Sequence, residues 1–368
     1  MRLALRELRR STRRFVPTTA ALALLVVLLL LLGGLLDGLY LGSTGALRAQ
    51  ESELIVYSKA SRDSVIRSRI DPALRDEIDA VPGVARTFGL GFALVGARVP
   101  GESELADVSV AGYQGAVDGV PPPPPVGQAW ADDSLEADGV DVGDRLLVGP
   151  ERVPVTVRGF VQDTNYLQQG GVWVAPVTWR TVLNKSRPGA AVGPRVFQVI
   201  AVRTAPGRSA SVVATRIERS THGATSALTR DETIQALPGI KEQDATFTQI
   251  IYVMFFVSAL VVALFFALLT LERLGLFAVL KAIGASARQL VAGLATQAVA
   301  VSVAAFFAGG LLTIALSLAI PPEVPLQLTV SRAVFVAVGV LAMALIGSAI
   351  SLRRIIRVDP ASVIGAGV

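Results

Sequence analysis

Residues 274–290, LGLFAVLKAIGASARQL, lie between two long apolar stretches and decide how the chain is organised. Their apolar members recur at intervals of three or four, which places them on one face of a helix: Leu276, Val279, Leu280 and Ile283. Gly284 can end that helix. Lys281 makes the segment basic, and short basic loops between membrane spans face the cytoplasm. We therefore expect an amphipathic helix at the membrane surface, acting either as a plain interfacial linker or as a docking element.

Four stretches are apolar enough to cross a bilayer, which takes about 20 helical residues. We expect these transmembrane helices at residues 17–41, 247–271, 290–320 and 333–352. The first follows several arginines, as a signal peptide would, but its apolar core is longer than the usual 7–15 or so residues, so we interpret it as a retained anchor. The composition agrees, because 52% of residues are hydrophobic and 17% are charged, against about 25% charged in globular domains.

Charges beside these spans predict their orientation. Three segments are net positive: residues 1–16, which should form an amphipathic helix, the segment 272–289 between the second and third spans, and the tail 353–368. Because Lys and Arg collect on the cytoplasmic side, all three should be cytoplasmic. The slightly acidic segment 42–246 and the short loop 321–332 are then extracytoplasmic. The chain should be a multi-pass protein of the cytoplasmic (inner) membrane. Its basic residues flank the spans, so its net charge of +5 does not indicate nucleic-acid binding.

The long extracytoplasmic segment is large enough to have a core of its own. Helical spacing occurs in DPALRDEIDAVPG and SASVVATRIERS, and β-favouring runs occur at 92–95, 108–110, 145–148, 153–161, 170–177 and 195–202. We predict a mixed α+β domain. Five consecutive prolines at residues 121–125 predict a polyproline II connector between two lobes of this domain.

Three segments resemble one protein family. FAVLKAIGAS resembles the GxLKAxGAS cytoplasmic segment of the FtsX/MacB-type ABC transporter permeases. LALRELRRSTRRFVPTT resembles the basic amphipathic helix before that family's first span, and RRIIRVDPASVIGAG resembles its R-x-x-x-x-DPxxxI/L tail. The resemblance implies an α-helical membrane protein with four transmembrane helices and a MacB-like α+β domain between the first two. LLDGLYLGSTGALRAQESELIVYS is further similar to the HrtB/DevC haem-exporter-like subgroup.

The resemblance also implies roles for individual residues. In the family, the cytoplasmic segment couples the membrane domain to a separate ATPase, which here points to Leu276, Val279, Leu280, Lys281, Ile283 and Gly284. Charged residues at the inner helix ends are candidates for contact with the ATPase or the membrane surface: Glu272, Arg273, Arg353 and Arg354. Asp37 and Tyr40, at the outer end of the first span, are candidates for the substrate side. The alternative for Asp37 is a carboxylate that simply reaches water.

The sequence carries no recognisable catalytic motif. It has no G-x-x-x-x-G-K-[ST], no G-x-S-x-G and no H-E-x-x-H, no Cys, and one His. We therefore expect no enzyme activity, no cofactor and no metal in this chain, with ATP and Mg²⁺ bound by a partner. Adjacent carboxylates such as Asp132 and Asp133 predict a solvated surface.

The expected function is that of an ABC transporter permease subunit. ATP hydrolysis by a separate ATPase would drive export, or extraction from the outer leaflet, of a hydrophobic or amphipathic substrate such as haem, a lipid or a drug. Expected partners are two ATPase copies, a second permease copy and membrane lipids, without nucleic acid. The alternatives are an FtsX-type mechanotransmitter that regulates cell-wall hydrolases, a lipoprotein-releasing permease, and a membrane-anchored sensor or adhesion protein without an ATPase.

Overall fold

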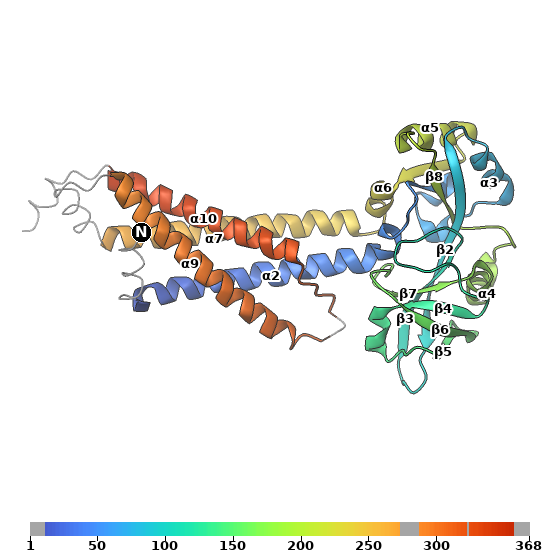
Figure 1. Ribbon diagram of the computed structural model, residues 1–368, viewed down its shortest axis with the longest axis horizontal. Coiled ribbons are helices and arrows are strands. Elements are labelled where there is room, and N and C mark those ends of the chain that lie inside the picture. Colours follow the sequence, from blue (N-terminus) through green and yellow to red (C-terminus); the bar gives the residue numbers. More distant parts are fainter. Residues whose placement is uncertain (1–11, 273–286, 322–323, 357–368) are drawn as a thin grey trace, which may run out of the picture. The chain divides into compact units, whose positions relative to one another are not determined.

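The computed structural model describes residues 12–272, 287–321 and 324–356 of the chain. It divides into two compact units (Figure 1). One unit, called here the helical unit, comprises Met1–Gly38 and Asp244–Val368. The other, Leu39–Gln243, is called the sheet unit.

Long helices occur at each position where a membrane span is predicted: α2 (Thr12–Arg48), α7 (Ile240–Glu272), α9 (Ala287–Ser317) and α10 (Val330–Ile356). Among the described residues, two apolar helical stretches are long enough to cross a membrane, Val16–Arg48 and Ala295–Ser317. The described apolar stretches of the other two helices are shorter, Thr248–Val261 and Val330–Ile346. The four-span arrangement therefore stays a prediction.

The helices pack through a shared apolar core within the helical unit. Its buried members come from α2, α9 and α10, and include Leu22, Val26, Leu29, Ala298, Val301, Ala305, Val336 and Val340. Phe255 of α7 packs against this core and meets the ring of Phe335 edge-on, with ring centroids 5.5 Å apart. A methyl group at Gly309 would overlap the side chain of Val26, so glycine allows α9 to approach α2 closely.

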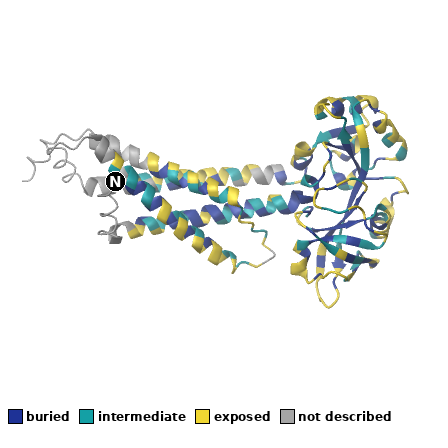
Figure 2. Cartoon of the chain, in the orientation of Figure 1, coloured by how far each residue is buried: buried dark blue, intermediate teal, exposed yellow. Residues whose placement is uncertain are grey.

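The outward faces of the same helices are also apolar. Large exposed side chains include Phe256 at 70%, Leu311 at 69% and Val338 at 61% exposure, and exposed positions recur along the helices in Figure 2. A helix that is hydrophobic all round is normally buried in a large protein or in a membrane. Soluble proteins rarely expose extensive apolar surface. The helical unit therefore has the surface of a membrane-embedded bundle.

The sheet unit is built on nine strands in the order β3-β7-β4-β6-β5-β2-β8-β1-β9. Their bounds are β1 (Leu54–Ser58), β2 (Val84–Arg98), β3 (Leu105–Tyr113), β4 (Gln128–Asp132), β5 (Arg145–Val148), β6 (Val153–Val161), β7 (Gly170–Val174), β8 (Val199–Thr204) and β9 (Thr225–Thr229). An added pairing between β2 and β3 closes six strands into a ring, while the first half of β2 pairs with β8. The long strand β2 thus joins the ring to β8, β1 and β9.

Short helices complete the sheet unit: α3 (Pro72–Asp79), α4 (Pro176–Ser186), α5 (Ala210–Ser220) and α6 (Arg230–Gln235), with 3₁₀ turns η1 (Lys59–Ser61), η2 (Val65–Arg67), η3 (Asp133–Asp138) and η4 (Pro188–Ala190). Asp71 caps α3, because its Oδ1 accepts a hydrogen bond from the backbone N–H of Leu74 at 2.9 Å. The unit is therefore mixed α+β, and the predicted strands at 145–148 and 153–161 occur with those bounds.

The prediction that residues 121–125 connect two lobes is wrong. The strands before and after this run, β3 and β4, belong to the same closed ring. Each strand also binds the run: Tyr113 Oη donates to the carbonyl of Pro121 at 2.5 Å, and Trp130 Nε1 donates to that of Pro122 at 3.2 Å. The prolines are fixed against the ring that they bridge.

The prediction of a solvated acidic surface at Asp132 is also wrong. Asp132 is only 1% exposed. Its Oδ2 accepts from the backbone N–H of Thr164 at 2.7 Å and from the Thr164 hydroxyl at 2.6 Å, while Oδ1 accepts from Ser134 N at 3.1 Å. Burial and the adjacent Asp132 raise the pKa of Asp133. Asp132 is therefore a structural carboxylate that starts η3 and fixes the loop at Thr164.

Candidate functional site

The predicted site residues fall in different parts of the chain. The coupling residues Leu276, Val279, Leu280, Lys281, Ile283 and Gly284 lie outside the described residues, as does Arg273. Glu272 is the last residue of α7, and Arg353 and Arg354 lie near the end of α10. Of the predicted residues, Asp37 is the one that the structure places in a polar cluster, and this cluster lies within the helical unit.

Asp37 on α2 is paired with Arg332, in the first turn of α10. Arg332 Nη2 lies 2.5 Å from Asp37 Oδ1, and Arg332 Nε donates to Oδ2 at 3.3 Å. The Asp37 side chain is only 17% exposed and the Arg332 side chain only 21%. A guanidinium that contacts both carboxylate oxygens holds a fixed geometry as well as a charge. The pair therefore ties α2 to the beginning of α10.

Thr329 completes this group, which we call the Asp37 cluster (Asp37, Thr329 and Arg332). The Thr329 hydroxyl donates to Asp37 Oδ2 at 2.6 Å and accepts from the backbone N–H of Arg332 at 3.2 Å. Thr329 directly precedes α10, so this second bond is an N-terminal helix cap. One hydroxyl thus caps α10 and orients the carboxylate that faces it.

Glycines on α2 make room for the cluster. A methyl group at Gly33 would overlap the stem of Arg332, and one at Gly38 would overlap the carbonyl of Pro325. The carbonyl of Gly34 accepts from the backbone N–H of Gln327 at 3.0 Å. The segment before α10 therefore lies directly against one face of α2, with glycines where it comes closest.

This geometry corrects the simplest interpretation of Asp37. The alternative that Asp37 merely reaches water is wrong, because both of its oxygens are bound by Arg332 and Thr329. A cationic substrate group at Asp37 would compete with Arg332 for the same carboxylate. Tyr40 belongs to the sheet unit, is 38% exposed, and accepts a hydrogen bond from Thr44 Oγ1 at its carbonyl. A substrate-side role for either residue stays a prediction.

Sequence reasoning missed the partners of Asp37. A signal was present: Arg332 lies at the predicted outer end of the fourth span, opposite in charge to the carboxylate at the outer end of the first. Ionisable residues at membrane depth are commonly paired with one another. Matching these two lone charges would have predicted that the first and fourth helices are neighbours.

Comparison with known proteins identifies the helical C-terminal part. Residues 249–360 match the family of FtsX-like permease C-terminal domains. An ABC transporter permease of Mycobacterium tuberculosis (strain H37Rv) is 40% identical over 120 residues, covering 32% of this chain and 33% of that protein. A hemin transport system permease, HrtB, of Staphylococcus epidermidis is 23% identical over 139 residues, covering 38% of this chain and 40% of that protein. The chain thus spans about a third of the length of these curated relatives.

Two solved structures are similar over about half of the chain. The periplasmic region of MacB from Actinobacillus actinomycetemcomitans has a TM-score of 0.35 and 11% identity, covering 51% of this chain and 94% of that one. The extracellular domain of the ABC-type transporter YknZ has a TM-score of 0.33 and 14% identity, covering 48% of this chain and 100% of that one.

The family match and the apolar helices together define a membrane protein with a permease domain. Residues 249–360 match the FtsX-like permease C-terminal domain, and the curated relatives are named as ABC transporter permeases or as hemin transport system permeases. The resemblance seen in the cytoplasmic segment is thereby confirmed.

Proposed function

We propose that this chain is the membrane subunit of an ABC transporter that exports a hydrophobic or amphipathic substrate or extracts it from the outer leaflet. The observation that carries this proposal is the match of residues 249–360 to the FtsX-like permease domain. The sequence contains no G-x-x-x-x-G-K-[ST] phosphate-binding motif. ATP and Mg²⁺ are then bound by a separate ATPase, and this chain supplies the membrane path and the docking element.

In this proposal the coupling step is made by the segment 272–289, which begins at the last residue of α7 and ends in the first turn of α9. An amphipathic helix there would seat its apolar face in a groove of the ATPase, as helices do in grooves generally. Closure of two ATPase copies on ATP would move two permease copies between two states, provided that the ATPase contacts differ between those states. Glu272, Arg273, Arg353 and Arg354 would add contacts at the same inner surface.

Haem is one candidate substrate, supported by similarity to a relative named as a hemin transport permease. The single histidine, His222, is exposed in the sheet unit. A haem iron held near the helices would therefore need Tyr, Met or a carboxylate as its protein ligand. Lipids and amphipathic drugs fit the apolar helical unit equally. FtsX-type regulation of cell-wall hydrolases and lipoprotein release are the alternative functions of the same architecture.

Membrane orientation is a direct prediction of this proposal. Reporter domains inserted after Gly139 and after Gly284 should lie on opposite sides of the membrane, with Gly139 outside and Gly284 in the cytoplasm. Gly139 is a suitable insertion point because it is an exposed turn residue with a φ of 80°. Paired alkaline phosphatase and green fluorescent protein fusions would measure this. A cytoplasmic Gly139 would contradict the orientation and place the sheet unit on the wrong side for an exporter.

The function itself is tested by purification of the tagged full-length chain from its native membrane in mild detergent. We expect an ABC ATPase, encoded beside the permease, to co-purify in equal amount. Two results together would favour the mechanotransmitter. One is that a cell-wall hydrolase co-purifies with the folded chain, and the other is that a strain lacking the chain accumulates no substrate. Recovery without any ATPase would contradict both functions.

A further inference from the structure

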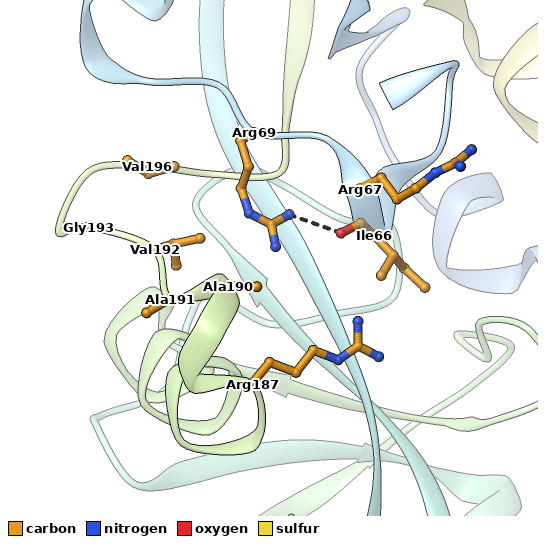
Figure 3. A pocket seen from close by; sticks show the side chains of 9 residues that line it. All are labelled: Ile66, Arg67, Arg69, Arg187, Ala190, Ala191, Val192, Gly193 and Val196. Atoms are coloured by element: carbon orange, nitrogen blue, oxygen red, sulfur yellow. Dashed lines mark hydrogen bonds between the residues drawn. The ribbon is translucent and has the colours of Figure 1, made fainter. Parts of the chain in front are cut away.

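A pocket of ≈ 560 Å³ in the sheet unit combines arginines with apolar side chains (Figure 3). One wall is the segment that follows β1, with Ile66 and Arg69. The other wall is the loop that follows α4, with Arg187, Val192 and Val196. The side chains of Arg69 and Arg187 extend into the space between these walls in Figure 3, each from its own wall.

The two walls are joined by hydrogen bonds. Ile70 N donates to the carbonyl of Phe197 at 2.8 Å, and Phe197 N donates to that of Ile70 at 3.2 Å. Asn184 fixes the loop, because its Nδ2 donates to the Val192 carbonyl at 3.0 Å and its Oδ1 accepts from Val192 N at 2.8 Å. The pocket is therefore built by paired backbone and a side-chain clamp, which fixes the two walls relative to each other.

Three arginines line this pocket, Arg67, Arg69 and Arg187, and none of its lining residues is acidic. Residues 59–69 carry Lys59, Arg62, Arg67 and Arg69 with a single acid, Asp63, and residues 185–195 carry Lys185, Arg187 and Arg195 with no acid. Among the residues that the structure describes, no carboxylate forms a salt bridge with Arg69 or Arg187. Arg69 instead donates to the carbonyls of Ile66 and Ser68, at 2.9 and 2.6 Å.

The positive charges of Arg69 and Arg187 repel each other. Burial, and then the positive charge of Arg187, lower the pKa of Arg69. Like charges held together in a fixed pocket repel, and a bound anion would relieve that repulsion. Guanidinium groups are also the side chains best shaped to hold the two oxygens of a carboxylate or phosphate.

We propose that this pocket binds an organic oxyanion, meaning a carboxylate or phosphate carried on a small apolar group. Arg69 and Arg187 would hold the oxyanion, and Ile66, Val192 and Val196 would contact the apolar group. The volume falls within the range of about 300–1,000 Å³ that is usual for small-molecule pockets. This site lies within the sheet unit and does not depend on the function proposed for the helical unit.

The test is isothermal titration calorimetry on the full-length chain in nanodiscs of zwitterionic lipid. The probes are hexyl phosphate and hexanoate, with inorganic phosphate to report a free anion and hexylammonium to report the apolar chain without the negative charge. We expect one hexyl anion to bind per chain, at least about tenfold more tightly than inorganic phosphate, and hexylammonium not to bind.

Three variants assign the binding to this pocket. Arg187→Gln should weaken binding about tenfold or more, since one charged donor is lost. Ala190→Asp should do the same without removing an arginine, because it places a carboxylate in the pocket lining. Arg145→Gln is the matched control, since Arg145 is exposed on β5 outside the pocket, and should leave binding unchanged. Thermal unfolding would show that each variant is folded.

Several results would overturn the proposal. One is that neither hexyl anion binds. Another is that inorganic phosphate binds as tightly as hexyl phosphate, which would remove the role of the apolar wall. A third is that folded Arg187→Gln and Ala190→Asp variants both bind like the wild type, which would place the bound anion elsewhere.

Discussion

Replacing Asp37 by Ala should destabilise the helical unit by about 2 kcal/mol, because its ion pair with Arg332 is part-buried and lies between exposed pairs and fully buried ones. The cost arises because Arg332, only 21% exposed, would keep its charge and lose its carboxylate partner. The Thr329 hydroxyl would lose its acceptor as well. Thermal unfolding of the purified chain in detergent would measure the effect, as a lower midpoint for the helical unit.

A matched pair provides the control for this prediction. Arg48 and Asp163 form an ion pair of the same 2.5 Å length in the sheet unit, but their side chains are 27% and 55% exposed. Asp163→Ala should therefore cost less than about 1 kcal/mol, as exposed pairs do. The double variant Asp37→Ala with Arg332→Ala should be more stable than the sum of its single variants predicts, because it removes both charges. Equal, small effects of Asp37→Ala and Asp163→Ala would show that the Asp37 cluster does not hold α2 to α10.

Replacing Leu280 by Asp should separate the chain from its ATPase. Each buried aliphatic anchor contributes about 1.5–3 kcal/mol when it is fully desolvated. The membrane surface competes for the same face of the predicted helix, so we expect the net loss to be nearer the lower value, which still weakens ATPase binding about tenfold. Insertion in the membrane should be unchanged. Co-purification of the ATPase with the tagged variant measures the loss.

Ala278→Asp is the matched control for Leu280→Asp, because Ala278 falls on the opposite face of the predicted helix and receives the same charge. This variant should retain the ATPase. If both variants retain it, the segment 272–289 is not the docking element. If both lose it, the added charge acts through the membrane surface and not through an apolar face.

The sequence predicts the helices of the helical unit well because their signal is local. A run of apolar residues as long as that in α9 or α2 is informative without knowledge of its neighbours. The short strands β5 and β6 are predictable for the same reason, since turn residues precede β5 and apolar residues alternate along β6.

Long-range pairing explains what the sequence does not predict. The runs at 92–95 and 108–110 extend into β2 and β3, because these strands pair with each other over Leu90–Arg98 and Leu105–Tyr113. Residues such as Gly91 and Gly112, poor formers of strands, lie within β2 and β3 because the ring of Trp179 packs where a larger side chain would sit. Closure of the ring depends on these distant contacts.

The Asp37 cluster and the arginine-lined pocket were not predicted from the sequence, because each also depends on long-range contacts. Asp37 and Arg332 are separated by 295 residues, and Arg69 and Arg187 come from distant segments that are brought together by contacts such as the pairing of Ile70 with Phe197. In neither pair are the two residues close enough in the sequence to form a recognisable motif. The sequence therefore shows that such charges exist. The structure shows that Arg332 is paired with Asp37, whereas in the part of the chain that it describes no carboxylate forms a salt bridge with Arg69 or Arg187.

The most direct measurement of the central claim is ATP hydrolysis by the partner ATPase in proteoliposomes, with and without this chain. The account predicts that the wild-type chain changes the rate about tenfold, which about 1.4 kcal/mol of differential contact would produce, and that Leu280→Asp abolishes this change while Ala278→Asp preserves it. An ATPase rate that is the same with and without the folded, membrane-inserted wild-type chain would contradict the account.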